Sequence, residues 1–511
     1  METLQFRGFD AWVVVIYLLS MVAIGFYFIR RNKTTEAYFV GNRGFAGWAL
    51  GISMLGTIVS SATFLALPAA AYILDWRQFS VNLALPLVAV LAIIFFVPIF
   101  RRSGITTAFE YLGMRYGRLA RIYGTLVFIV MQLIRSAQVL FLMALPIHFL
   151  TGTPIHWVII GTGLFVAIYT VAGGITTVIW TTVIQTLVML VGGIICVVYI
   201  TISLPDGLVQ VFELGAAEDK FSLGDYNWDL AERTFWTVAL LGLVNWLTIY
   251  GGDQNMVQRY ASARSTREAR KAVVVYTTLA LPIWALFFFV GTCLFAYYRV
   301  FPNEFVDNLA ADEVLPFFIL TRIPDGLSGL IIAAIVAAAM STLGACINAI
   351  STVTVVDLLK PFILRNKSDR FYLFSAVAAA AVAAVLIVMC ALFFSYIPKE
   401  SMNDISLIVT SVFGGCVMGL FMLGFFTRRV NGFAVNIALV AASLFNVYLG
   451  LSALGLLPGF LTLPVHSYWV GALVNLLFIL LAFAIVLIRR TPPSEFEGLT
   501  VWSMPKEEEI K

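Results

Sequence analysis

The chain has 511 residues, of which 61% are apolar and 12% are charged, and its net charge is +4. Soluble proteins carry about 25% charged residues, so this composition excludes an ordinary soluble fold. At roughly 20 residues per bilayer-spanning helix, the apolar residues suffice for about a dozen spans. The basic residues are dispersed, which excludes a nucleic-acid-binding surface. We therefore predict an all-α polytopic membrane protein.

Apolar runs of helical length predict about thirteen transmembrane helices. If residues 1–8 face outward, most of the 32 lysine and arginine residues fall in cytoplasmic loops or in the C-terminal tail. The positive-inside rule then predicts an N-terminus outside the cell and a cytoplasmic C-terminus. In chain order the predicted spans lie near residues 9–29, 47–73, 80–100, 122–149, 155–172, 177–203, 235–252, 273–298, 326–357, 372–396, 404–427, 431–453 and 467–488.

Two predicted spans are interrupted by small and polar residues. The second contains residues 51–63 (GISMLGTIVSSAT), and the seventh contains residues 242–252 (GLVNWLTIYGG). Such clusters free backbone carbonyls at membrane depth, which is tolerated where the chain lines a cavity. The alternative is that the small residues allow close helix packing.

The second and seventh spans lie five spans apart, so they cross the membrane in opposite directions. Interrupted helices at matching places in two halves indicate inverted repeats with a binding site near the middle of the membrane. We therefore divide the chain into four parts. These are an N-terminal peripheral helix with a cytoplasmic loop (1–46), a first repeat (47–234), a second repeat (235–430), and two peripheral helices with a cytoplasmic tail (431–511).

Three separated runs share one pattern: Gly173–Gln185 (GGITTVIWTTVIQ), Asp253–Tyr260 (DQNMVQRY), and Gly414-Gly415 followed by Phe425–Asn431 (FFTRRVN). In order and spacing they resemble the sodium:solute symporter family, and the resemblance covers about residues 5–490. Within the family the first 190 residues look most like the bacterial sialic-acid symporters. The resemblance implies a leucine-transporter-like fold with a 5+5 inverted repeat, in a bacterial inner membrane. It also implies a protein that imports a solute together with sodium. We expect the protein to work as a monomer.

The resemblance also implies a sodium site between the broken second span and the ninth span. Carried over to this sequence, its ligands are the carbonyls of Gly56, Val59 and Ala338 and the hydroxyls of Ser341 and Thr342. The sequence agrees, because Ala338, Ser341 and Thr342 are spaced to share one helix face. A dehydrated hard cation needs several oxygen ligands, which this set supplies. The alternative is that Ser341 and Thr342 bond only to their own helix backbone.

Some relatives bind a second sodium ion through an acid and further serines. Those positions correspond here to Thr182, Gly344 and Ala345. Because the carboxylate and the serine hydroxyls are missing, we expect one sodium per solute.

Arg135 is the only basic residue that we place deep in a span, and we predict no acid at the same depth. Burying an arginine there costs about 2.5–3.5 kcal/mol on insertion scales, so a ligand partner is expected. Its guanidinium fork suits a carboxylate. In the sialic-acid symporters an arginine at this place binds the substrate carboxylate. Ser60, Thr63 and Asn82 complete the predicted substrate site, and the alternative is that Arg135 bonds to carbonyls of a broken helix.

The predicted solute is small and acidic, with sialic acid or a related sugar acid preferred. Asn82 stands where the resemblance leads us to expect glutamine, and Ile58 and Gln78 replace a polar residue and an aromatic one. A neutral sugar, a polyol or a monocarboxylate therefore remains an alternative solute. The sugar alternative is weakened because the family's sugar-contacting positions correspond to Ile58, Thr63 and Leu407.

Two further readings stay open. Tyr250, beside the seventh-span interruption, is either an aromatic gate or a core residue. An anion channel or a membrane sensor is the competing class of protein, although a channel would need a continuous charged pore. The sequence has no HExxH, nucleophile-elbow or P-loop motif, so we do not expect an enzyme.

Overall fold

The computed structural model describes residues 8–29, 34–229, 231–396, 402–453, 456–493, 496 and 498–503, and these residues form an all-helical membrane protein. The expected outward segment before Gly8 and the last residues of the expected cytoplasmic tail lie outside this range. The α-helices are α1 (Gly8–Ile29), α2 (Thr35–Val40), α3 (Gly47–Ile58), α4 (Leu67–Ile73), α5 (Leu85–Leu91), α6 (Val97–Arg102), α7 (Ala108–Tyr116), α8 (Arg118–Thr151), α9 (Ile155–Ile202), α10 (Gly207–Ala217), α11 (Phe235–Gly252), α12 (Gln254–Ser262), α13 (Thr266–Val300), α14 (Ala311–Arg322), α15 (Leu327–Val353), α16 (Asp369–Phe394), α17 (Met402–Phe413), α18 (Val417–Phe426), α19 (Gly432–Ala453) and α20 (Val470–Ile488). Short 3₁₀ or π segments are η1 (Gly41–Arg43), η2 (Ala62–Ala66), η3 (Arg77–Asn82), η4 (Ala92–Phe96), η5 (Val306–Asn308), η6 (Thr354–Ile363), η7 (Gly459–Leu461) and η8 (Ser467–Trp469).

The second predicted span is broken, as expected. The segments Gly47–Ile58 and Ala62–Ile73 meet at an angle of 61°. Val59 leaves the helix with an extended backbone (φ −79°, ψ 118°), and the Ser60 backbone N–H donates to the Thr63 hydroxyl at 3.2 Å. A helix that ends at membrane depth leaves its last carbonyls without helical partners, so this end must find other donors.

The interruption predicted within residues 242–252 is wrong in its position. Helix α11 continues through Gly252, and only Asp253 is extended (φ −73°, ψ 125°) before α12 begins. The glycines serve close packing instead. A methyl group on Gly242 would lie 2.1 Å from the Val81 carbonyl oxygen, and one on Gly252 would lie 2.3 Å from the Phe421 ring.

The number of long helices differs from the predicted thirteen spans. The described residues contain ten helices long and apolar enough to cross a membrane, or eleven when the bent pair counts as one span. The fifth and sixth predicted spans join in α9, where Gly174 alone has a non-helical backbone (φ 55°, ψ −174°). The predicted span 404–427 is divided into α17 and α18, with Gly415 at φ 55° between them.

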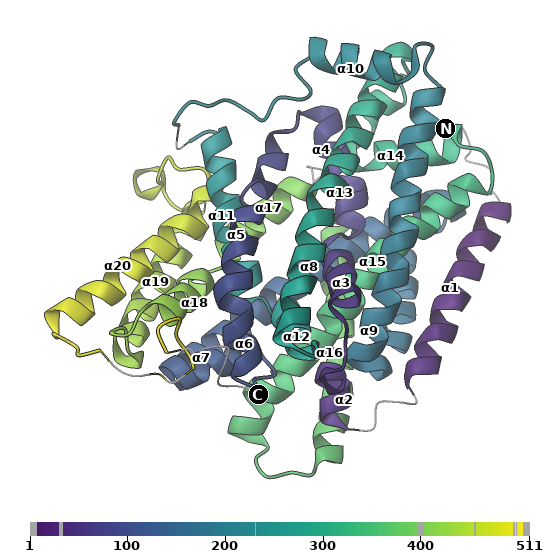
Figure 1. Ribbon diagram of the computed structural model, residues 1–511. Coiled ribbons are helices and arrows are strands. Elements are labelled where there is room, and N and C mark those ends of the chain that lie inside the picture. Colours follow the sequence, from purple (N-terminus) through teal and green to yellow (C-terminus); the bar gives the residue numbers. More distant parts are fainter. Residues whose placement is uncertain are drawn as a thin grey trace.

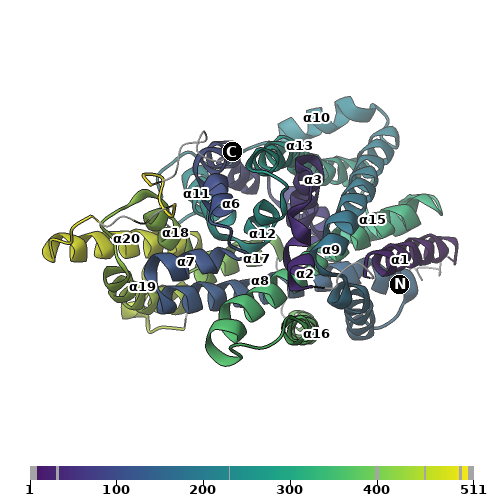
Figure 2. The same ribbon diagram turned by 60° about the horizontal axis from the view of Figure 1, so that its bottom comes forward.

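Helix α15 forms the centre of the bundle, and almost all of its residues are buried. The N-terminal helix α1 lies on one flank, whereas α19 and α20 lie on the opposite flank in both views (Figures 1 and 2). The Asp10 carboxylate on α1 accepts hydrogen bonds from the backbone N–H groups of Gly326 and Gly329, at 2.6 and 2.9 Å, and so caps the start of α15.

One end of the bundle is covered by α10 and the segment that follows it (Figure 1). Lys220 in this segment donates from Nζ to the carbonyls of Tyr72 and Leu74, each at 2.8 Å, at the C-terminal end of α4. Burial lowers the pKa of Lys220 from its ordinary value. The segment is therefore tied to the second half of the broken span.

Candidate substrate and sodium site

A cavity of about 260 Å³ lies beside the break between α3 and α4. Its walls come mainly from the break itself, η3, α8, α11, α17 and α20, and single residues of α7, α13, α16 and α18 complete them. All four residues predicted to bind the solute, Ser60, Thr63, Asn82 and Arg135, line this cavity. The structure thus brings together residues from three separate segments, while their role in binding stays a prediction.

Four of the five residues predicted to bind sodium, Gly56, Ala338, Ser341 and Thr342, meet where α15 packs against α3. The Ser341 hydroxyl donates to the Gly56 carbonyl at 2.6 Å, and the Thr342 hydroxyl donates to the Thr57 carbonyl at 3.1 Å. Both hydroxyls also lie near the Ala338 carbonyl of their own helix, at 2.8 and 3.3 Å. Ser341 and Thr342 therefore form hydrogen bonds to the backbone of their own helix, which was the alternative, and also to the backbone of α3.

These contacts gather oxygen atoms from α3 and α15 at one buried point. Gly56 is packed against α9, because a methyl group there would lie 2.1 Å from the Thr186 hydroxyl and 2.6 Å from Thr182. Val59 is fully buried at the end of α3. Neutral carbonyl and hydroxyl oxygens are suitable ligands for a hard monovalent cation.

Arg135 links the cavity to the end of α3, because its Nη2 donates to the Ile58 carbonyl at 3.2 Å. Three successive carbonyls at the end of this helix, those of Gly56, Thr57 and Ile58, thus accept from Ser341, Thr342 and Arg135. Arg135 therefore does form a hydrogen bond to a carbonyl of the broken helix, which was the alternative to a ligand partner. The same guanidinium lines the cavity, so one side chain contacts both the helix end and the solute space.

Two features of the charge distribution differ from the prediction. An acid does lie at the depth of Arg135, because Asp253 lines the same cavity and its charge interacts with that of Arg135. Arg135 is also not the only basic residue within a span: Arg259 lies in the span Phe235–Ser262 and is 1% exposed. Its guanidinium donates to the Asn255 carbonyl at 2.7 Å and to the Ser53 hydroxyl at 3.2 Å.

Tyr250 packs as a core residue in this structure. It is fully buried, its hydroxyl lies 2.7 Å from that of Thr277, and its ring packs against Trp246 and Tyr276. The positions Thr182, Gly344 and Ala345, which we compared with a second sodium site, are buried. Within the described ranges no group of three histidine, cysteine, aspartate or glutamate side chains could hold a metal ion.

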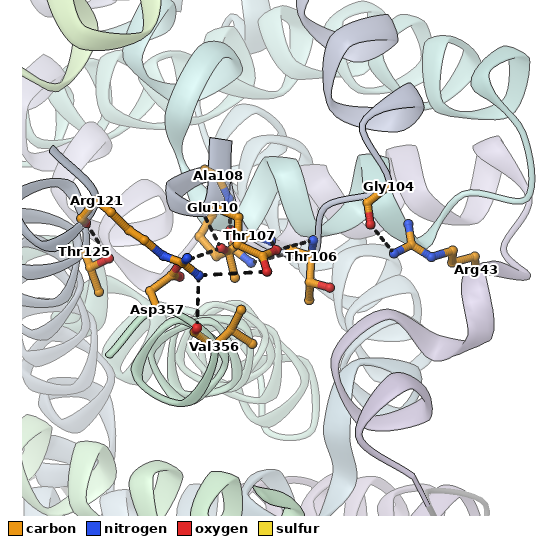
Figure 3. A network of polar contacts seen from close by, with 11 residues as sticks. Arg43, Gly104, Thr106, Thr107, Ala108, Glu110, Arg121, Thr125, Val356 and Asp357 are labelled. Atoms are coloured by element: carbon orange, nitrogen blue, oxygen red, sulfur yellow. Dashed lines mark hydrogen bonds and ion pairs between the residues drawn. The ribbon is translucent and has the colours of Figure 1, made fainter. Parts of the chain in front are cut away.

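A second polar network lies at the end of the bundle opposite α10, and the sequence analysis did not identify it (Figure 3). Arg121 on α8 forms an ion pair with the fully buried Asp357 on η6, with Nε 2.8 Å from Oδ1. The Thr107 hydroxyl donates to the same oxygen at 3.0 Å, and Arg121 Nη2 donates to the Val356 carbonyl at 3.0 Å. The only sign of this network in the sequence was Asp357, an acid at the end of the long apolar run 326–357.

The broken helix, the cluster of oxygens at its end and the cavity beside it define a membrane transport protein of the secondary-transporter type. Residues 38–441 match the model of the sodium:solute symporter family, and the chain belongs to that family. The resemblance found in the sequence is thus confirmed. The chain is accordingly a sodium-coupled symporter and not an enzyme.

Similar proteins include two bacterial symporters. The sodium/sialic acid symporter NanT of Aliivibrio fischeri is 32% identical over 86% of this chain and 88% of its own length. SiaT of Proteus mirabilis, also a sodium/sialic acid symporter, is 31% identical over 85% and 88%. The human sodium/iodide cotransporter is 30% identical over 88% of this chain and 71% of its own length.

Solved structures show the same fold. The substrate-bound, outward-open state of a Na⁺-coupled sialic acid symporter matches with a TM-score of 0.86 and 27% identity, over 96% of this chain and 100% of that one. The nucleobase-cation symporter Mhp1 in a closed conformation matches with a TM-score of 0.55 and 16% identity, over 90% and 96%. The predicted leucine-transporter-like fold is therefore confirmed, apart from the exact number of spans.

Proposed function

We propose that this symporter imports a small acidic solute, namely sialic acid or a related sugar acid, together with one sodium ion. The observation that supports this proposal best is that Arg135 contacts both the cavity and the end of α3. Its guanidinium lines the cavity and also donates to the Ile58 carbonyl, between the carbonyls that we assign to sodium. A carboxylate on Arg135 and a cation behind Ile58 would then stabilise the same short unwound segment.

We assign the sodium ion to the carbonyls of Gly56, Val59 and Ala338 and the hydroxyls of Ser341 and Thr342. When the cation binds, the two hydroxyl groups would turn their lone pairs toward it and give up hydrogen bonds to the carbonyls. Five neutral oxygens balance the loss of water without the cost of a buried carboxylate. Because the ligands come from α3 and α15, binding would hold these two helices together.

We assign the solute carboxylate to Arg135, because a guanidinium fork can hold a carboxylate through two parallel hydrogen bonds. Ser60, Thr63 and Asn82 would bind the hydroxyl or amide groups of the solute. The named function of the relatives NanT and SiaT supports a sugar acid of the sialic type.

A compact monocarboxylate is the second candidate. Ile58 contributes an apolar side chain to the cavity beside Arg135. The human sodium-coupled monocarboxylate transporter 1 is 28% identical over 87% of this chain. A neutral sugar or polyol would bring no carboxylate to the Arg135 guanidinium, which would then keep its charge interaction with Asp253.

The division into two inverted repeats, 47–234 and 235–430, with peripheral parts 1–46 and 431–511, belongs to the same proposal. We place the protein in the bilayer of a bacterial inner membrane as a monomer, with the N-terminus outside and the C-terminus in the cytoplasm. The basic loops of the sequence support this orientation. The Arg121 network then lies at the cytoplasmic end.

Uptake of radiolabelled N-acetylneuraminate into proteoliposomes tests the proposal. We expect uptake with an inward sodium gradient and at least tenfold less when potassium replaces sodium. Arg135→Lys keeps the charge but loses the planar fork, so uptake should fall at least tenfold. Arg365→Lys, a matched change at an exposed position, should leave uptake unchanged. Equal uptake in the two salts would refute sodium coupling, and full activity of Arg135→Lys would refute the carboxylate assignment.

A further inference from the structure

We propose that Asp253 is a specificity-determining residue, which makes the cavity prefer acids that carry hydroxyl or N–H donors over anions that carry none. This inference rests on the proposed function of the same cavity. It goes beyond that function because it assigns a role to an acid that faces the solute space and that the proposed binding of sodium and carboxylate does not use.

The Asp253 carboxylate is held at the cavity by two hydrogen bonds from the protein. Its Oδ1 accepts from the Asn255 backbone N–H at 2.7 Å, in the position of a cap on α12. Its Oδ2 accepts from Gln132 Nε2 at 3.0 Å, and the other end of that amide accepts from the Cys346 thiol at 3.0 Å. The orientation of the carboxylate is therefore fixed from both sides.

An ionised carboxylate only accepts hydrogen bonds and has about four lone-pair sites. The two bonds from the protein leave acceptor capacity on a group that lines the cavity. A solute hydroxyl or N–H group can use this capacity. A solute without donors would displace water from Asp253 and offer no hydrogen bond in its place. Leaving a buried acceptor unsatisfied in this way costs about 1–3 kcal/mol, and more for a charged group.

The charges of the cavity strengthen this discrimination. Gln132 and Arg135 lie three residues apart on α8, so the helix face that holds Asp253 also presents the guanidinium. The negative charge of Asp253 offsets the positive charge of Arg135 at the cavity. An anion therefore gains less from simple attraction than it would beside an isolated arginine, and it must form directed hydrogen bonds to bind.

Asp253→Asn tests this role with little change in shape. Asparagine is as good a helix cap as aspartate, so α12 should keep its start. Two carboxylate probes of different kinds are N-acetylneuraminate, which carries hydroxyl and amide donors, and cyclohexanecarboxylate, which has a ring and an acid but no other donor. Binding of both to the purified full-length protein is measured by calorimetry in sodium buffer. The quantity of interest is the ratio of the two affinities.

In the wild type we expect N-acetylneuraminate to bind at least 100-fold more tightly than cyclohexanecarboxylate. In Asp253→Asn this ratio should fall at least tenfold, through weaker binding of the first probe and stronger binding of the second. Asp10→Asn is a matched control, because Asp10 is a buried acid on α1 that caps α15 away from the cavity. It should leave the ratio unchanged.

An unchanged ratio in Asp253→Asn, with sodium-dependent binding intact, would overturn the role of Asp253 alone. A purely structural role would weaken both probes equally and also leave the ratio unchanged. If the wild type does not bind N-acetylneuraminate in sodium, the proposed function fails instead. Equal affinities of the wild type for the two probes would also overturn the inference.

Discussion

Ser341 and Ser351 lie on the same helix, and each donates to a backbone carbonyl of a neighbouring segment. Ser341 reaches the Gly56 carbonyl at 2.6 Å, and Ser351 reaches the Ala376 carbonyl at 2.6 Å. Only the first contact lies at the break that we assign to sodium. The pair therefore separates a proposed sodium ligand, Ser341, from Ser351, which forms an ordinary helix–helix hydrogen bond.

We predict that Ser341→Ala weakens sodium binding about tenfold, because one of five oxygen ligands is lost, and this corresponds to about 1.4 kcal/mol. Ser351→Ala should lower thermal stability to a similar degree without changing sodium affinity. Both can be measured from the rise in melting temperature with sodium concentration, with choline as the replacement cation. Identical sodium dependence in the two variants would contradict the assignment of Ser341.

The sequence predicted the positions of some single residues well and missed others. The spacing of Ala338, Ser341 and Thr342 was visible because an α-helix places such residues on one face. Asp253 was not assigned to the cavity, because the sequence shows it only as the residue after an apolar run. Arg259 falls between the predicted spans 235–252 and 273–298, and its burial was missed because its partners come from α3 and α12 and no local pattern reveals them.

At the scale of elements, the Arg121–Asp357 ion pair joins α8 to η6, and Thr107 adds the start of α7 (Figure 3). Breaking such a pair by removing one partner leaves an uncompensated charge, whereas an apolar replacement of both partners is often neutral. We predict that Asp357→Leu destabilises the protein by about 3 kcal/mol, and that Arg121→Met added to it recovers most of this loss.

Thermal unfolding of the wild type, the two single variants and the double variant in detergent forms the required cycle. Glu110 lies 3.9 Å from Arg121 and can partly replace Asp357, so Arg121→Met alone should be at least as damaging as Asp357→Leu. Additive losses in the double variant would show that the two charges do not stabilise these elements as a pair.

The elements themselves were largely predictable, because apolar runs of bilayer length leave few alternatives to a helix. The break after Ile58 was also predictable, since glycine and hydroxyl residues coincide there. The same kind of pattern placed the second interruption too early: α11 runs on to Gly252, whose missing side chain makes room for Phe421, and Asp253 is the first extended residue. Small residues thus indicate either a break or a close contact, and only the packed structure distinguishes the two.

At the scale of the whole molecule, the number of sodium ions sets the charge that crosses the membrane in each cycle. One sodium ion with one monoanionic solute carries no net charge, whereas two sodium ions would carry one positive charge. A single charge gains about 2.3 kcal/mol per 100 mV, which corresponds to roughly 50-fold in the accumulation of the solute. The proposed single site therefore predicts electroneutral transport.

Proteoliposomes with a potassium gradient and valinomycin provide the measurement. Accumulation of N-acetylneuraminate at a fixed sodium gradient should be the same at 0 mV and at about −100 mV, and it should depend on sodium with a Hill coefficient near one. The physical reason is that Thr182, Gly344 and Ala345 offer no carboxylate and only one hydroxyl for a second cation. A strong increase in accumulation at negative potential inside would contradict one sodium per solute, and it would direct attention to the buried polar surroundings of Thr182.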